Sequence, residues 1–402
     1  MKPHQVRALT LLAIVTAAGL AGTAVVDRQA AAAVAQMDRV SDALCARREA
    51  RPGPSISSDA APIDDDAFTH YERAAALAEA IDDAADVRPL LAATDPQLAE
   101  APRRPTWRPV VDALLAGARS VRREFPRVDR AFGCANLLTY RRTANLALFE
   151  ARAARHEGRG HDAVRITTAV MAMGAACVED GVLINQMVGA AIVAIAVDAW
   201  PDDALRSVDE ATLRALAAGL RRIDARLPTS LDLDAELVQL AAALTAVPDP
   251  TDWCGLGGWR YGFSARWMCA DAYLALARTA ERLRAAEDRP WPARQRVFEQ
   301  ELGALASMPN EAAQMIAPNL DACERQLRWN VAHLRLLRQA VALHLGAADS
   351  LADPLADGPL QVQHQVDHVT LASAGDDGRG QLRREVRARA QSTGARTSFT
   401  KR

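Results

Sequence analysis

The fold of this chain is decided by residues 136–180, which read NLLTYRRTANLALFEARAARHEGRGHDAVRITTAVMAMGAACVED. Apolar side chains recur with the helical period of 3.6 on both sides of a break at residues 157–160, EGRG. Two helices joined by a short glycine turn are typical of an antiparallel helical hairpin. Residues 182–200 follow as a third helix. Their uncharged core is too short and too closely interrupted by Asn185, Gln186 and Asp198 to cross a membrane, so we expect a helix buried on nearly all sides.

The same period continues outward from this stretch. A first body helix is expected from Asp64 to about Ala85, and later helices are expected at about 209–226, 231–246, 265–287, 291–306 and 310–346. Half of the residues are hydrophobic and only 4% are aromatic, which favours a core of packed helices over sheets. No strand signal precedes Gly346. The sequence therefore predicts an all-α body at residues 63–346, an array of antiparallel helical hairpins.

The N-terminus predicts a membrane helix. Residues 8–26 form an apolar run without charge, close to the roughly 20 residues that cross a bilayer core. Lys2 and Arg7 precede the run, and the positive-inside rule then keeps the N-terminus in the cytoplasm. We expect residues 1–28 to be a signal anchor in the cell inner membrane, with one span and the bulk of the chain periplasmic or extracytoplasmic. A cleaved signal peptide, with small residues at 30–32, and a soluble amphipathic helix are the alternatives.

The segments around the body follow from composition. Residues 29–62 are expected to be a membrane-proximal helix and then a linker rich in Pro, Ser and Gly. Residues 347–378 alternate with period two between turn signals, which predicts a small β-hairpin that docks on the helices. Residues 379–402 hold many arginines and a single acid, and we expect a basic flexible tail.

Charge and cysteines exclude several classes of partner and site. The net charge of −2 argues against a polyanion partner, and we expect no nucleic acid to bind this chain. The six cysteines allow 15 complete disulfide pairings, between which the sequence cannot choose. None of them forms a C-x-x-C pair, so a zinc site or a thioredoxin-like motif is not expected.

Other polar clusters have structural interpretations. His156 and His161 are five residues apart with two glycines between them, so they do not form the i, i+4 pair of a zinc protease. His364 and His368 are expected to be exposed turn residues of the hairpin. The alternating acids Asp232, Asp234 and Glu236 fit a helix start that Ser230 caps. No catalytic, cofactor-binding or metal-ligating residue is assigned, and no cofactor is expected.

The strongest local anomaly is residues 253–273, WCGLGGWRYGFSARWMCADAY, which hold six of the chain's aromatic residues. Its glycines predict a loop, and Cys254 and Cys269 have a spacing compatible with a disulfide. One interpretation is an aromatic plug over the helical core. The other is an exposed partner-binding loop, because aromatic and arginine side chains dominate recognition surfaces. Its candidate contact residues are Trp253, Trp259, Arg260, Tyr261, Phe263 and Trp267.

Two stretches resemble known families. Residues 136–200 resemble uncharacterised α-helical envelope proteins of planctomycete- and myxobacteria-like bacteria, which often carry an N-terminal membrane segment. Residues 353–378 are similar to the C-terminal hairpin of type II secretion pseudopilins, which carry a DP turn and a loop that can bind calcium. Here that loop reads Ser373-Ala374-Gly375-Asp376-Asp377-Gly378. The N-terminus lacks the pseudopilin processing site, and a long helical body is foreign to pseudopilins. The resemblance implies an envelope location and supplies no active site.

These observations lead to two functional hypotheses. The first is a membrane-anchored, exported helical scaffold or binding protein, whose partners are the cytoplasmic membrane through residues 8–26 and an unknown envelope protein or polymer. The second is an envelope enzyme whose site is assembled from distant helices, since function belongs to sites rather than to folds.

Overall fold

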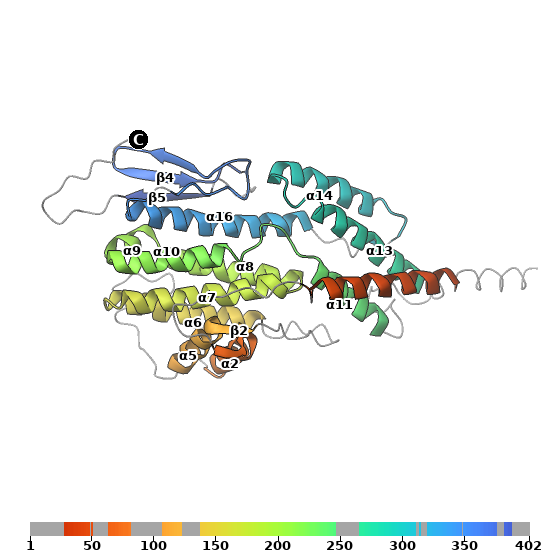
Figure 1. Cartoon of the computed structure of the whole chain (residues 1–402), viewed down its shortest axis with the longest axis horizontal. Helices are drawn as coiled ribbons and strands as arrows, with labels where there is room; N and C mark the ends of the chain where they lie inside the picture. Colours follow the sequence, from red (N-terminus) through yellow and green to blue (C-terminus); the bar gives the residue numbers. More distant parts are fainter. Residues whose placement is uncertain are drawn as a thin grey trace, which may run out of the picture.

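The structure is a computed structural model that describes residues 28–48, 50, 63–81, 107–122, 137–246, 265–310, 313–314, 320–347, 349–375 and 382–387. These residues are mostly helical, with a small antiparallel sheet near the C-terminus (Figure 1). The predicted all-α character of the body and the C-terminal hairpin are confirmed. The regular array of helical hairpins stays a prediction.

The helices agree closely with the helical period of the sequence. One helix occupies residues 28–48. The others are α2 (Ala67–Glu79), α5 (Arg108–Arg119), α6 (Leu137–His156), α7 (Gly160–Asp180), α8 (Leu183–Asp198), α9 (Asp202–Ser207), α10 (Glu210–Asp224), α11 (Asp234–Ala246), α13 (Ala265–Arg284), α14 (Trp291–Ala306) and α16 (Leu320–His344). None of the helices within the described ranges is long and apolar enough to span a bilayer. The predicted membrane segment, residues 8–26, lies outside those ranges.

Short polar and glycine signals set the helix ends. Gly158 has a φ of 75° in the turn that joins α6 to α7, a backbone conformation that glycine adopts without strain. Asp209 caps α10, because its carboxylate accepts a hydrogen bond from the Thr212 N–H at 2.6 Å. Gly346, with a φ of 70°, follows the last turn of α16, where the Ala347 N–H donates to the Ala342 carbonyl.

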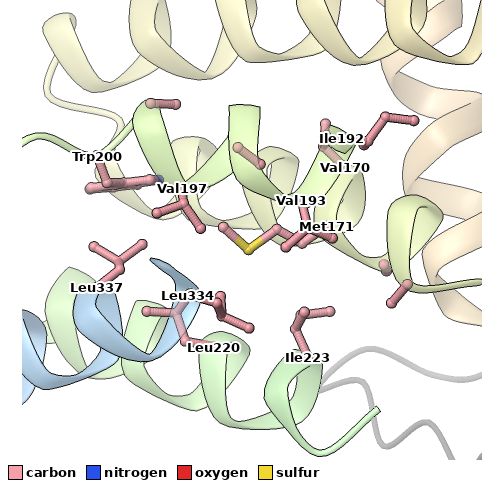
Figure 2. Packing of buried hydrophobic residues seen from close by; sticks show 14 of the residues in the cluster. Val170, Met171, Ile192, Val193, Val197, Trp200, Leu220, Ile223, Leu334 and Leu337 are labelled. Atoms are coloured by element: carbon pink, nitrogen blue, oxygen red, sulfur yellow. The ribbon is translucent and has the colours of Figure 1, made fainter. Parts of the chain in front are cut away.

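The larger core lies between α6, α7, α8, α10 and α16. Figure 2 shows Met171 of α7, Val193 of α8 and Leu334 of α16 converging on its centre. The α8 helix exposes only Ile184, Ala191 and Asp198, which confirms the prediction of a helix buried on nearly all sides. Its mostly apolar surface is needed because other helices cover it on several faces.

Two glycines allow α7 and α8 to approach closely. A methyl group at Gly174 of α7 would lie 2.6 Å from the carbonyl oxygen of Gly189 of α8. It would also crowd the side chain of Val193 at 2.9 Å. Because a real carbon atom does not come this close to a backbone oxygen, the helix–helix distance depends on these glycines.

A second core joins the helix of residues 28–48 to α11, α13, α14 and α16. Met37 and Leu44 are buried in it together with Tyr273 and Phe298. This helix therefore packs into the body's own core, and the predicted linker at residues 49–62 lies almost entirely outside the described residues. The α16 helix contributes to both cores, with Leu320 in the second and Leu337 in the first.

A short parallel strand pair was not expected. Strand β1 (Ile63–Asp66) pairs with β2 (Ser120–Arg122), at the point where the sequence analysis placed a helix start. The helix begins only at Ala67, and its cap is Asp66, which accepts from the Thr69 N–H at 3.0 Å. The prediction of no strand before Gly346 is thus wrong. Three acids in a row suit a helix start, but only the last one caps it.

The C-terminal sheet has one strand more than the predicted hairpin. Strands β3 (Gln361–His364) and β4 (His368–Ala372) form the hairpin, and β5 (Arg383–Arg387) pairs with β4. Residues 383–387 were assigned to the basic flexible tail. They form a strand because Val386 is buried in the larger core while Glu385 stays exposed. The sheet packs on α16 (Figure 1).

Candidate functional site

The aromatic segment singled out in the sequence lies mostly outside the described residues. Trp253, Cys254, Trp259, Arg260, Tyr261 and Phe263 fall in this undescribed part. Trp267 lies in the first turn of α13 with 38% of its surface exposed, and Cys269, two residues later, is buried. The binding loop and the Cys254–Cys269 disulfide therefore stay predictions.

The alternating acids before and in α11 have structural roles. The Asp232 carboxylate accepts from the Asp234 N–H at 2.9 Å, an Asx turn just before α11, while the Ser230 hydroxyl donates to Glu287 at 2.6 Å. The Asp234 carboxylate is fully buried and forms an ion pair with Arg284. Glu236 accepts from the Leu183 N–H of α8 at 2.9 Å, and burial raises the pKa of its carboxyl group. Their charges and hydrogen bonds fix the start of α11 against its neighbours.

A buried Arg–Glu–Arg cluster ties α14 to α16. The Glu324 carboxylate accepts hydrogen bonds from Arg294 of α14 and from Arg328, one turn along its own helix, where Nη2 lies 2.9 Å from Oε1. The backbone N–H of Leu231 also donates to it at 3.2 Å. All three side chains are buried, with at most 4% of each exposed.

The remaining donors of this cluster are also engaged. Arg294 donates to the carbonyl of Leu283, and Arg328 donates to the carbonyl of Pro354 at 3.1 Å. The guanidinium of Arg328 lies 5.0 Å from the ring centre of Trp291, a cation–π distance. Burial lowers the pKa of Arg328, and the adjacent Glu324 opposes that shift. Because these partners occupy the polar groups, the cluster is a structural clamp.

A second polar cluster lies where the C-terminal sheet meets α8, α9 and α16. His333 of α16 pairs with Asp198 at the end of α8, with 3.3 Å between Nε2 and Oδ1. Three turns later His344 pairs with Asp202 of α9, with 3.0 Å between Nε2 and Oδ1. Arg384 of β5 donates to the carbonyl of Trp200, the residue between the two aspartates' helices. The Arg387 N–H of the same strand donates to Asp202 at 3.3 Å, so the sheet is fastened to the start of α9 and to the residues just before it.

The electrostatics of this cluster are unusual. Burial and the positive charge of Arg384 lower the pKa of His333 to about 4, so the imidazole is neutral near pH 7. Burial also lowers the pKa of Arg384 to about 10, although Asp202 and Asp198 oppose this. Burial alone would raise the pKa of Asp202, but hydrogen bonds from His344 and from the Arg387 N–H hold it below its usual value.

Two donor or acceptor atoms in this cluster lack partners among the described residues, namely Nδ1 of His333 and Nε of Arg384. A neutral imidazole can accept a hydrogen bond at its free nitrogen, but a pKa of about 4 makes it a weak base near pH 7. Sequence reasoning missed this cluster because its members come from residues 198, 202, 333, 344 and 384. No local spacing links them.

The remaining histidine motifs give no metal site. His368 lies in β4 with its Nδ1 2.7 Å from the carboxylate of Asp367, and His364 lies across the turn in β3. Within the described ranges, no group of three or more His, Cys, Asp or Glu side chains could hold a metal ion. The Asp353 carboxylate accepts from Ser373 and from two backbone N–H groups, so it closes the turn beside the loop that resembles a calcium site. Asp376 and Asp377 of that loop lie outside the described residues.

Comparison with known proteins gives no relative. No family model, no curated protein and no solved structure matches this chain.

Proposed function

We propose that this chain is a membrane-anchored, exported helical scaffold or binding protein. The observation that carries the proposal is the docking of the helix at residues 28–48. This helix begins two residues after the apolar run at 8–26 ends, and it packs into the core of the body. A body attached in this way is held rigidly over a membrane anchor.

Both apolar and ionic contacts fix the docked helix. The side chains of Met37 and Leu44 are 1% and 3% exposed. Arg47, near the end of the helix, lies 3.0 Å from the Glu281 carboxylate and 3.7 Å from that of Asp234. The exposed ion pair contributes little to stability, whereas the two buried apolar side chains contribute roughly 1.5–3 kcal/mol each.

The polar side chains of the body also support a scaffold. The buried charges of Asp234 and Glu324 serve contacts between helices, and so does Asp224 of α10, which pairs with Arg335 of α16 at 2.9 Å. Such pairs set the arrangement of the helices and leave their outer surfaces for binding.

The anchor and its direction are testable by reporter fusion. We expect alkaline phosphatase fused after residue 60 to be active, because the linker should lie outside the cytoplasm. We also expect the full chain to stay with membranes after alkaline extraction. A fusion at residue 60 that is active only with a cytoplasmic reporter would overturn the topology. Recovery of the full chain in the soluble fraction would overturn the anchor.

The rigid attachment is tested by a matched pair of substitutions in the docked helix. Met37→Asp places a charge in the core, and Gln36→Asp places one on the exposed side of the same turn. After protease cleavage between the helix and the body, we expect the helix to separate from the body in the Met37→Asp variant and to stay bound to it in the Gln36→Asp variant. Equal behaviour of the two variants would contradict a docked helix.

An envelope enzyme is the second candidate, and the His333–Arg384 cluster is the observation that favours it. A histidine and an arginine with strongly shifted pKa values are typical of functional sites, although structural clusters also shift them. The variant His333→Asn distinguishes the two hypotheses. The enzyme hypothesis expects a folded chain that fails to complement a deletion strain, whereas the scaffold hypothesis expects normal complementation at neutral pH.

A further inference from the structure

We propose that two copies of this chain pair edge to edge through strand β3, in antiparallel orientation, so that their C-terminal sheets join into one. The partner at this edge is therefore a second copy of the same chain. The inference rests on the proposed membrane anchor, because the paired surface is small and gains from copies that share one membrane. It makes the proposed scaffold a two-fold symmetric assembly.

The C-terminal sheet leaves one of its edges open. Strand β3 lies at the edge of the order β3-β4-β5, and all four of its residues, Gln361–His364, are exposed. Strands β4 and β5, in contrast, pack on α16. An exposed edge strand presents backbone N–H and C=O groups that can bond to an extended chain beside it.

The β-hairpin shows which backbone groups of β3 bond to β4. The Gln365 N–H donates to the His368 carbonyl at 2.8 Å, next to the turn. Opposite residues of an antiparallel pair alternate between hydrogen-bonded and non-hydrogen-bonded. Because residue 365 is hydrogen-bonded, residues 363 and 361 also bond to β4, at the positions opposite Thr370 and Ala372.

The alternate residues, Val362 and His364, direct their N–H and C=O groups away from β4. Leu360 follows the same alternation, because its N–H donates outward to the Leu351 carbonyl at 2.8 Å. Among the described residues, no backbone group beyond β3 pairs with Val362 or His364. The open part of the edge therefore consists of two residues that lie two positions apart.

Two open residues at this spacing are self-complementary. When a second copy runs antiparallel with Gln363 opposite Gln363, Val362 of each copy lies opposite His364 of the other. Each of these two pairs exchanges two backbone hydrogen bonds, which is the pattern of a regular antiparallel ladder. The side chain of Val362, which is 38% exposed, then packs against the imidazole of the other copy. The two Gln363 side chains meet on the opposite side of the sheet.

Charge also favours a second copy at this edge. Strand β3 reads QVQH and contains no Asp, Glu, Lys or Arg, so no pair of these charges meets across the two-fold axis. Strand β5, at the other edge, has three arginines among its five residues, and these would repel the β5 strand of another copy. Charges of this kind protect edge strands from pairing, and β3 has none of them.

The pairing is too small to hold two copies together in dilute solution. It joins four residues of each copy, whereas a standard stable interface has about 20–30 residues on each side. A membrane anchor at residues 8–26 would confine the copies to one surface and raise their effective concentration. We therefore expect the dimer in membranes and expect it to dissociate on dilution in detergent.

The pairing also orients the body over the membrane. In Figure 1 the strands of the sheet and the helix of residues 28–48 both run along the long axis of the molecule. A two-fold axis between antiparallel strands is perpendicular to them, so the two docked helices point in opposite directions. Both anchors enter one membrane when this two-fold axis follows the membrane normal. The two bodies then lie along the membrane surface.

Cysteine crosslinking in membranes that contain the full chain tests the pairing. In the symmetric register the two Gln363 residues form a non-hydrogen-bonded pair, whose Cα atoms are about 4.5 Å apart. This separation lies within the range of about 4.4–6.8 Å that a disulfide spans. After oxidation we expect Gln363→Cys to give at least about fivefold more disulfide-linked dimer than the wild type with its native cysteines.

Gln361→Cys is the matched control, because Gln361 is an exposed glutamine on the same side of the same strand. In the symmetric register its two copies are four positions apart along the strands, a separation of more than about 13 Å. A disulfide does not span this distance, so we expect no more dimer than in the wild type.

A substitution at the open edge tests the hydrogen bonds. Val362→Pro removes an outward N–H that the single copy does not use, and edge strands tolerate proline at such positions. Added to Gln363→Cys, it should reduce the dimer to the level of the Gln361→Cys control. Val362→Lys keeps the N–H and adds a charge, so it provides the same test if the proline lowers the unfolding midpoint.

Three results would overturn the proposal. The first is equal crosslinking of Gln363→Cys and Gln361→Cys, and the second is a Val362→Pro variant that crosslinks as before. The third is a crosslinked product that contains a different protein in place of the second copy. Alkaline extraction tests the anchor separately. A chain that stays in membranes without forming the dimer overturns this inference alone, whereas a dimer in the soluble fraction supports the strand pairing and overturns the anchor.

Discussion

Removal of the charge of Glu324 is expected to destabilise the body severely. Glu324→Gln keeps the shape of the side chain but leaves two buried guanidinium groups, Arg294 and Arg328, without a counter-charge. The new amide NH₂ group would also face a donor. Breaking a buried pair in this way lowers the free energy of unfolding by about 3–5 kcal/mol. Denaturant unfolding of the full chain in detergent, followed by circular dichroism, measures the loss.

The matched control is Glu210→Gln on α10. Glu210 pairs with Arg214 one turn along the helix at 2.5 Å, but both side chains are largely exposed. Water screens such a pair, so the expected loss is about 0.5 kcal/mol at most. If Glu324→Gln lost no more than this control, the buried cluster would not be the clamp described above. A triple Met variant of the cluster should recover much of the stability, because it removes every buried charge together.

The other predictions concern packing, pH and topology. Gly174→Ala should lower the free energy of unfolding by about 1–3 kcal/mol, because its methyl group would meet the Gly189 carbonyl at 2.6 Å. Gly303→Ala in the last turn of α14, where a methyl group meets no atom within 4 Å, should raise the free energy of unfolding by up to about 0.5–1 kcal/mol. Equal effects of the two substitutions in denaturant unfolding would refute this explanation. The lowered pKa of His333, about 4 against an ordinary 6.5, means that the unfolded chain binds the extra proton first. Stability should therefore be complete above about pH 6.5 and fall by about 3 kcal/mol as the pH drops to 4. His333→Asn should flatten this part of the pH profile of the unfolding midpoint, and an unchanged profile would show that another group titrates. For the topology, phosphatase activity of the fusion after residue 60 is the expected outcome.

Local sequence signals predicted the helices because each signal acts within a few residues. The glycine turn after α6 lies at the expected position, and α14 has the expected bounds, 291–306. The sequence predicted less accurately where some of the helices begin. The expected helix at 310–346 begins, as α16, only at Leu320, and the expected start at Asp64 is a strand. Helix propensity does not show which of the three aspartates, 64–66, caps the helix and which belong to the strand before it.

Contacts between distant segments explain the other differences. Residues 383–387 form a strand although three of the five are arginines, because pairing with β4 buries Val386 against α16. The helix at residues 28–48 packs on α11, α13 and α14, which lie far along the chain. In both cases a segment far along the chain supplies the apolar surface, and local composition does not show which distant segment that is.

The sequence by itself determined that the body is helical, where most helices begin and end, and that α8 is buried on nearly all sides. Periodicity, glycine turns and caps are local, so they can be read without a fold. Only the tertiary structure decided which charges meet. Glu324 joins Arg294 across 30 positions, and His333 lies beside Arg384 across 51. Such pairs form only when helix packing brings the two side chains together. Burial then lowers the dielectric around them, so that an unpaired charge would be costly.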